Sequence, residues 1–255
     1  MIDLTGRRAF VTGGGRGIGR ATALLLARAG ARVAIGFRTR RVDADETARM
    51  IAGGPQGGRG IVVGGDLGDP AVAQRTVDDV VSALGGLDLL IVNHGVWPPD
   101  DIPLTQMPDT QWEGTLRANL DSVFFVCRAA IPHLPDGGRV VLVSSTAGQR
   151  GEAFHADYAV TKGAVIALTK SLAVELAPRI TVNCVAPGWV DTEMARQPFA
   201  RDDGGGRRAI ENTIPLGRVA TPEDIAGPIA FLCSSLAQHV TGEILNVNGG
   251  SVLCG

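Results

Sequence analysis

Short runs of Val, Ile and Leu alternate along the chain with longer stretches in which apolar and polar residues mix in a helical pattern. Apolar runs bounded by turn-forming residues are typical of β-strands, and runs without polar alternation are typical of strands buried on both faces of a parallel sheet. We predict seven strands, at residues 8–12, 32–37, 60–64, 87–92, 139–144, 180–185 and 244–247. The stretches between them are predicted as helices, which begin near Gly17, Asp43, Pro70, Asp109, Asp157 and Thr221.

Strands that alternate with helices indicate an α/β fold. The prediction is a Rossmann-type doubly wound sheet of about seven parallel strands, with helices on both faces. A chain of 255 residues is long enough for one such sheet, and no internal repeat interrupts it. We therefore expect a single domain over residues 1–255, in which the glycine-rich stretches 53–58 and 204–206 are surface loops rather than domain linkers.

Charge and hydropathy exclude two classes of partner. The 24 basic and 26 acidic residues leave a net charge of −2, and no basic block is present that could neutralise a run of phosphates. No nucleic acid partner is expected. No apolar stretch approaches the roughly 18 to 20 residues that cross a membrane, and the first residues lack an apolar segment behind a basic start. We therefore expect a cytoplasmic protein that does not insert into a membrane.

The cysteines give no sign of a metal centre. Their spacing fits neither metal ligation nor a redox pair, so reduced thiols and no metal site are predicted for Cys127, Cys184, Cys233 and Cys254.

A glycine-rich turn follows the first predicted strand. Residues 12–19 read Thr-Gly-Gly-Gly-Arg-Gly-Ile-Gly and run directly into an apolar helical stretch. Glycines let a backbone approach a diphosphate closely, and the free N–H groups at the start of the helix favour an anion. The segment predicts a dinucleotide-binding turn, with a purely structural turn as the alternative. Three residues separate Gly13 from Gly17, which departs from the widespread G-x-G-x-x-G spacing.

A second motif suits proton transfer. Tyr158 is the chain's single tyrosine, and Lys162 follows it by one turn of a predicted helix, on the same face. A phenol titrates near 10, so a neighbouring ammonium that stabilises its anion brings it closer to use at neutral pH. Ser145 follows a predicted strand, where ligand sites in open α/β sheets lie. Taken alone, the tyrosine–lysine spacing is more typical of a surface or packing role.

Together these motifs resemble the short-chain dehydrogenase/reductase family, and most closely its 3-oxoacyl-(acyl-carrier-protein) reductase branch, over about residues 3–251. The resemblance implies a nicotinamide-dependent enzyme that interconverts a ketone and a secondary alcohol. Tyr158 is then the proton donor or acceptor, and Lys162 supports its anion. Ser145 binds the carbonyl oxygen, with Ser144 as the competing candidate, and Asn119 holds a water in a proton path.

The resemblance also implies a cofactor site. In this fold an acid at the end of the second strand binds the ribose 2′-hydroxyl of NAD, and arginine accommodates a 2′-phosphate. Phe37 stands where that acid is expected, and Arg16 and Arg38 suit a phosphate. NADP(H) is therefore preferred, NAD(H) stays possible, and a solvated arginine loop is the alternative. The residues assigned to the cofactor are Gly13, Arg16, Gly17, Ile18, Gly19, Arg38, Asp66, Leu67, Asn93, Gly95, Tyr158, Lys162, Pro187, Gly188, Val190 and Thr192.

One of these assignments, and one residue beside them, carry open points. Asp66 matches a family acid that hydrogen-bonds the adenine, but a turn or capping role fits it as well. His94 departs from the family, which has Ala there, and no chemical role is assigned to it.

The substrate and the assembly follow only from the resemblance. Residues 189–218 are expected to form a mobile lid over a moderately apolar pocket that Trp97, Phe154 and His155 also line. Sugar, polyol, steroid and other alcohol dehydrogenases share the motifs and stay as alternatives. A dinucleotide-binding redox sensor is the non-enzyme alternative, and the presence of both Tyr158 and Lys162 argues against it. A homotetramer is expected, built on apolar helix surface at Val123, Phe124, Val126, Val165 and Leu168.

Overall fold

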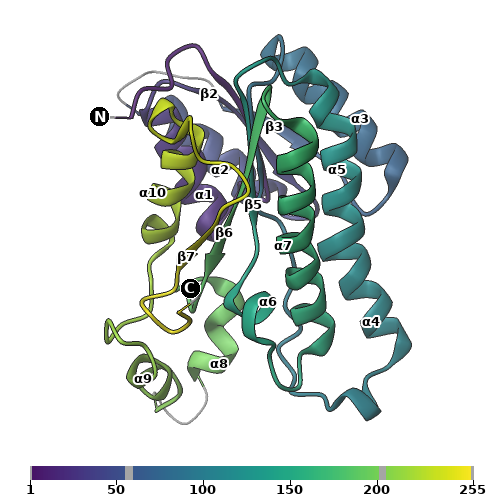
Figure 1. The fold of residues 1–255 in the computed structure, drawn as a ribbon, viewed down its shortest axis with the longest axis vertical. Coiled ribbons are helices and arrows are strands. Elements are labelled where there is room, and N and C mark those ends of the chain that lie inside the picture. Colours follow the sequence, from purple (N-terminus) through teal and green to yellow (C-terminus); the bar gives the residue numbers. More distant parts are fainter. Residues whose placement is uncertain (1, 55–59, 201–204, 254–255) are drawn as a thin grey trace.

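The computed structural model describes residues 2–54, 60–200 and 205–253, and its centre is a parallel sheet of seven strands (Figure 1). The spatial order is β3-β2-β1-β4-β5-β6-β7. All seven predicted strands are present, because each apolar run is long enough to cross the buried sheet. The strands are β1 (Arg8–Thr12), β2 (Arg32–Phe37), β3 (Ile61–Gly64), β4 (Leu89–Val92), β5 (Gly138–Val143), β6 (Ile180–Pro187) and β7 (Ile244–Val247).

Helices cover both faces of the sheet, which confirms the doubly wound architecture. Figure 1 shows α1, α2 and α10 on one side of the sheet and α3, α5 and α7 on the other. No helix in the described ranges is long and apolar enough to cross a membrane. The helices are α1 (Gly17–Arg28), α2 (Arg41–Ala52), α3 (Pro70–Leu84), α4 (Asp109–Leu116), α5 (Ser122–Ala130), α6 (Thr146–Arg150), α7 (Ala156–Leu176), α8 (Arg196–Ala200), α9 (Gly205–Asn212) and α10 (Pro222–Cys233).

Side-chain alternation along the strands builds two cores. Successive residues of a strand point to opposite faces, so Leu89 and Ile91 of β4 pack under α1 and α10, and Leu90 and Val92 pack under α3 and α5. All four are almost completely buried. This is why the strands need continuous apolar runs rather than alternating ones.

The cysteines of the described residues are free thiols in these cores, as predicted. Burial raises the pKa of Cys127 and of Cys233 to about 12, and that of Cys184 to about 11. Cys254 lies outside the described residues.

One predicted helix contains an unanticipated irregularity. The stretch that begins at Asp109 is α4, then a π-helical turn over Arg117–Asp121, then α5. A π turn inserts one extra residue and rotates the helix face that follows it, and such turns are frequent at functional sites. Here the turn carries the buried Asn119.

Three expected surface residues are in fact core residues. Val123 and Val126 of α5, and Val165 of α7, are almost completely buried against the sheet, so their assignment to an apolar surface is wrong. Residues three or four apart share a helix face, and this face of α5 covers the strands. Phe124 points outward, with 46% of its surface exposed, whereas Leu168 packs partly against the core.

The short helices were not predicted. α6 and α8 have five residues each, too few for a hydrophobic period to show. α9 begins at Gly205, inside a glycine stretch that was predicted as a loop, and Gly204 lies outside the described residues. All three helices lie near the carboxyl ends of the strands (Figure 1).

Candidate active site

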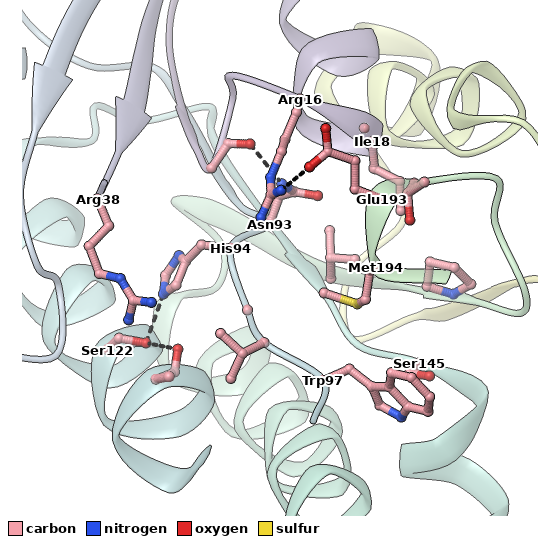
Figure 2. Close-up of a pocket in the computed structure, with 18 of the residues that line it drawn as sticks. Arg16, Ile18, Arg38, Asn93, His94, Trp97, Ser122, Ser145, Glu193 and Met194 are labelled. Atoms are coloured by element: carbon pink, nitrogen blue, oxygen red, sulfur yellow. Dashed lines mark hydrogen bonds and ion pairs between the residues drawn. The ribbon is translucent and has the colours of Figure 1, made fainter. Parts of the chain in front are cut away.

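A pocket of about 350 Å³ opens at the carboxyl ends of the strands (Figure 2). β1 lies between β2 and β4, so the strand order reverses here, and ligands in open α/β sheets bind at such a switch point. The predicted cofactor and catalytic residues line this pocket except Gly19 and Asn119, which lie directly behind it.

The glycine turn fits a diphosphate. A Cβ on Gly19 would lie 2.1 Å from the carbonyl oxygen of Gly13, so only glycine lets the first turn of α1 close onto β1. Asn93, after β4, holds the turn in place, since its Nδ2 donates to the carbonyl oxygens of Thr12 at 3.2 Å and Gly13 at 3.4 Å. The side chain of Arg16, the N-cap residue of α1, makes no capping hydrogen bond. The first N–H groups of α1 are therefore left for an anion.

The tyrosine, lysine and serine meet on one wall of the pocket. Lys162 Nζ lies 5.7 Å from the centroid of the Tyr158 ring on α7, and it donates a 3.0 Å hydrogen bond to the carbonyl oxygen of Val143 at the end of β5. Ser145 is hydrogen-bonded to Tyr158. Ser144 is buried and donates to the carbonyl oxygen of Lys162 at 2.7 Å. Ser145, not Ser144, is therefore the serine beside the phenol.

Comparisons with known proteins agree with this geometry. A family model described as enoyl-(acyl carrier protein) reductase matches residues 13–251. The chain is 36% identical to the 3-oxoacyl-(acyl-carrier-protein) reductases of Vibrio cholerae and Escherichia coli, over 98% of each chain. A crystal structure of a short-chain dehydrogenase/reductase from Brucella melitensis, titled glucose/ribitol dehydrogenase, superposes with a TM-score of 0.91 at 34% identity, over 99% of both chains.

The chain belongs to the short-chain dehydrogenase/reductase family. It is therefore an oxidoreductase of the NAD(P)-dependent class that acts on CH–OH groups. A short-chain dehydrogenase from Burkholderia cenocepacia in complex with NADP is similar as well, with a TM-score of 0.89 and 35% identity over 97% of this chain and 98% of that one.

In this short-chain dehydrogenase/reductase, the protein alone opposes ionisation of the phenol. Burial, together with a smaller effect of the Glu152 charge, raises the pKa of Tyr158 to about 12, against the lowering effect of the hydrogen bond from Ser145. Burial also lowers the pKa of Lys162 to about 8. The lysine therefore does not by itself supply the lowering expected from the sequence. A cationic oxidised nicotinamide is the further charge that the chemistry calls for.

Asn119 connects the lysine helix to the loop after β4. Its Oδ1 accepts from the Val96 N–H at 2.7 Å, and its Nδ2 donates to the Val96 carbonyl oxygen at 2.8 Å and to Thr161 Oγ1 at 3.3 Å. A Cβ on Gly95 would lie 3.2 Å from Asn119 Oδ1 and 3.4 Å from Lys162 Nζ, so all three meet closely. The assigned role in a proton path stays a prediction.

His94 is a fixed neutral imidazole. Ser122 donates its hydroxyl hydrogen to the carbonyl oxygen of Ala118, so at 2.7 Å it accepts from His94 Nε2. His94 Nδ1 then accepts from the Thr12 hydroxyl, also at 2.7 Å. Burial lowers the pKa of His94 to about 3, with the nearby Lys162 charge adding to the effect. The residue joins β1 to α5 at the pocket wall and does not change its protonation state near neutral pH.

Asp66, the acid assigned to the adenine, has the turn role that the sequence left open. Asp66 accepts from the Gly68 N–H at 3.2 Å and from Arg117 Nη2 at 2.8 Å. Burial raises the pKa of this carboxyl, but the two hydrogen bonds and the arginine charge hold it below its ordinary value. Asp66 still lines the pocket, so a contact with adenine stays a prediction. Among the described residues, no cluster of three or more His, Cys, Asp or Glu is arranged to hold a metal ion.

Near the glycine turn, arginine side chains form ion pairs with an acid that the sequence analysis did not single out. Glu193 forms a short ion pair with Arg16 and lies 3.7 Å from Arg40 Nη1. Arg40 also binds Asp43 at 2.6 Å. Arg38 lines the pocket and makes no ion pair within the described residues. In Figure 2 Arg38 lies beside His94 and Ser122, whereas Arg16 and Glu193 lie together near the glycine turn.

The substrate end of the pocket is lined by aromatic residues and one acid. Trp97, Trp189, Met194 and Glu152 line it beside Ser145 and Tyr158. Two expected lining residues are not part of it. His155 is buried behind Trp97, at 4.5 Å between ring centroids, and Phe154 is 52% exposed and does not line the pocket.

Proposed function

We propose that this enzyme uses NADP(H) to interconvert a ketone and a secondary alcohol, with a 3-oxoacyl thioester as the leading substrate class. The observation that carries the proposal is the meeting of Ser145, Tyr158 and Lys162 in the same pocket as the glycine turn. Its relatives named 3-oxoacyl-(acyl-carrier-protein) reductase and the neighbour bound to NADP support it.

Each side chain has one task in this reaction. Ser145 donates a hydrogen bond to the carbonyl oxygen and fixes it near Tyr158, which gives its proton to that oxygen as alkoxide character develops. Lys162 stabilises the tyrosinate that remains. The nicotinamide, when bound, supplies or accepts the hydride. Oxidation of the alcohol uses the same groups in reverse.

The preference for NADP(H) rests on charge at the adenosine end of the pocket. Phe37 lines the pocket where an acid would otherwise bind the 2′-hydroxyl, and Arg16 and Arg38 line it nearby. A guanidinium matches a phosphate in both charge and geometry.

Three further expectations stay predictions: a single domain, a mobile lid over residues 189–218 and a cytoplasmic location.

A substrate panel tests the proposal. NADPH consumption is followed with 3-oxoacyl thioesters, sugars, steroid ketones and simple ketones. Turnover of at least one carbonyl class is expected, with the thioesters giving the highest kcat/KM. If sugars or steroid ketones give the highest kcat/KM, the enzyme is one of the other dehydrogenases of this family. The neighbour titled glucose/ribitol dehydrogenase is an example of that group. If NADPH binds but nothing is reduced, the redox-sensor alternative takes its place.

The form in which the acyl group arrives is a second prediction. Relatives that accept acyl carrier protein carry basic residues just before β5 and midway along the tyrosine helix. Here residues 130–138 contain no Lys or Arg. Val174 is assigned to the second position, although the structure places it in the last turn of α7 rather than midway along it, and it is 82% exposed. We expect a coenzyme-linked or small ketone to be reduced at least as well as the carrier-linked group, with little salt dependence of kcat/KM. A strong carrier preference that collapses in salt would contradict this.

The assembly is a third prediction. We expect a homotetramer, in which α4, α5 and α7 pair between subunits through exposed apolar side chains. In the structure these are Phe124, Val160 and Val174 rather than the buried valines of the same helices. Light scattering should give four times the chain mass of 26.4 kDa. Phe124→Glu should lower the measured mass, whereas a monomer of the unmodified protein would contradict the prediction.

A further inference from the structure

A carboxylate lies among the aromatic side chains at the substrate end of the pocket. Glu152 lies between α6 and α7, is partly buried, and lines the pocket together with Trp97, Trp189 and Tyr158. The reaction derived above does not use it. Trp97 donates to Glu152, whose charge acts on Tyr158, the hydrogen-bond partner of Ser145, and Figure 2 shows Trp97 on the side of the pocket away from Arg38. Glu152 therefore belongs to the part of the pocket that receives substrate rather than adenosine.

This carboxylate is poorly satisfied by the protein. Its Oε2 accepts from Trp97 Nε1 at 3.4 Å, a long hydrogen bond, and within the described ranges no group donates to its Oε1. Burial raises the pKa of Glu152 above its ordinary value, against the lowering effect of the nearby His155. Oε1 itself is open to solvent rather than enclosed by the protein. A ligand that displaces water from this oxygen must therefore bring a hydrogen-bond donor of its own, or the carboxylate loses a hydrogen bond.

Among the described residues, no neighbouring side chain donates a hydrogen bond to Glu152 Oε1. His155 Nε2 lies 3.2 Å from Asp101, and its ring packs on Trp97. Arg150 lines the pocket and affects Glu152 only through charge, without a hydrogen bond to it. An alkyl chain placed here would remove water from Oε1 and offer no hydrogen bond in its place.

We propose that Glu152 selects substrates that carry a hydrogen-bond donor, a hydroxyl or a protonated amine, near the carbonyl. The donor binds Glu152 Oε1, and Trp97 and Trp189 contact the carbon skeleton. This rests on the proposed function, in which Ser145 and Tyr158 hold the carbonyl oxygen. It narrows the substrate to hydroxyketones, aminoketones or acyl groups with a donor on the thioester side, and disfavours a plain alkyl ketone.

Glu152 also acts on the proton donor. Tyr158 is faced by Ser145, Lys162 and Glu152, and the negative charge of Glu152 raises the pKa of the phenol. Arg150, His155 and Asp101 are the charged or titratable groups around Glu152 itself. A donor bound to the carboxylate screens its charge, so the correct substrate makes Tyr158 easier to ionise.

The first test compares matched ketones. Hydroxyacetone and its longer hydroxyketone homologues are measured against ketones with a methyl group in place of the hydroxyl, butanone being the shortest, and against aminoacetone. We expect kcat/KM to favour the best donor ketone over its alkyl partner by ~10- to 100-fold, the range for a hydrogen bond to a charged group. A higher kcat/KM for aminoacetone than for hydroxyacetone identifies the ammonium as the preferred donor, and a lower kcat/KM identifies the hydroxyl. Equal values for donor and alkyl ketones in the unmodified enzyme would overturn the inference.

Two variants separate charge from shape. Glu152→Leu should bring the donor-to-alkyl ratio close to one, and Glu152→Gln, which keeps an acceptor oxygen, should retain part of it. Glu152→Gln should also shift the rise of the alcohol-oxidation rate to lower pH, because oxidation needs the tyrosinate and the variant removes the charge that raises its pKa. Glu175→Leu, an exposed acid of α7 away from the pocket, is the matched control and should keep both the ratio and the pH profile. An unchanged ratio in Glu152→Leu would contradict the proposal.

A binding readout keeps this inference distinct from the proposed function. In a Tyr158→Phe background, quenching of the fluorescence of Trp97 and Trp189 reports ketone binding without turnover. Tighter binding of the donor ketone that is lost in Glu152→Leu supports the inference even if no ketone is reduced. Equal binding of both ketones overturns it even if reduction is observed.

Discussion

Tyr158→Phe is expected to lower kcat for ketone reduction by ~10²- to 10⁴-fold, the usual contribution of a positioned proton donor. The variant removes the hydroxyl and keeps the ring beside Lys162. The glycine turn and the arginines lie elsewhere in the pocket, so the Kd for NADPH should change little. Stopped-flow measurement of a single turnover checks the chemical step, and calorimetric titration checks the Kd. A variant that keeps most of its activity would show that another group provides the proton.

The neighbouring serines provide the matched control. Ser145→Ala removes the hydroxyl that hydrogen-bonds Tyr158, so it should lower kcat. The same hydroxyl caps α6 by accepting from the Ala147 N–H at 3.1 Å, so the melting temperature should also fall somewhat. Ser144→Ala removes a buried 2.7 Å hydrogen bond to the carbonyl oxygen of Lys162 and should lower the melting temperature without a comparable loss of kcat. Equal losses of activity in the two variants would mean that the assignment of Ser145 to the carbonyl is wrong.

The fold could be predicted because its signal is repeated along the chain. Each strand is a continuous apolar run, and β4 shows why: Leu89 and Leu90 serve opposite cores, so neither position tolerates a polar side chain. The helix pattern was less decisive. It predicted a single helix from Asp109, which the structure divides into α4, a π-helical turn and α5. It also put Val123 and Val126 on the outside, because a helix that is apolar on several sides does not reveal which side faces the sheet.

The site was predicted where a local motif carries it. The glycine turn, Ser145 and the tyrosine–lysine pair are short patterns with a direct chemical reason, and the structure brings them into one pocket. Glu152 and Glu193 have no such pattern. Glu152 matters because the chain places it beside Trp97, and Glu193 because it reaches Arg16 from far along the sequence. Such long-range pairs have no period or spacing that a single sequence could reveal.

NADPH is expected to be preferred over NADH, and Arg38→Asp is expected to reverse or abolish that preference. An arginine–phosphate hydrogen bond contributes about 1.5–3 kcal/mol, so its loss changes the ratio of the two kcat/KM values by ~10- to 100-fold. The new carboxylate repels the 2′-phosphate and can accept from a 2′-hydroxyl, which adds to the change. Comparable kcat/KM for both cofactors in the unmodified enzyme would contradict the assignment.

Control variants separate contact from general charge. Arg41 pairs with Asp45 and does not line the pocket, so Arg41→Asp makes the same charge change nearby and should leave the cofactor ratio within about twofold. Glu193 pairs with Arg16, so a 2′-phosphate bound at Arg16 would compete with it. Glu193→Gln should therefore tighten binding of 2′-phospho-AMP relative to AMP, measured by calorimetry without any turnover. If Arg41→Asp and Arg38→Asp shift the ratio equally, the preference comes from the summed positive charge of the loop and not from an arginine in contact with the phosphate.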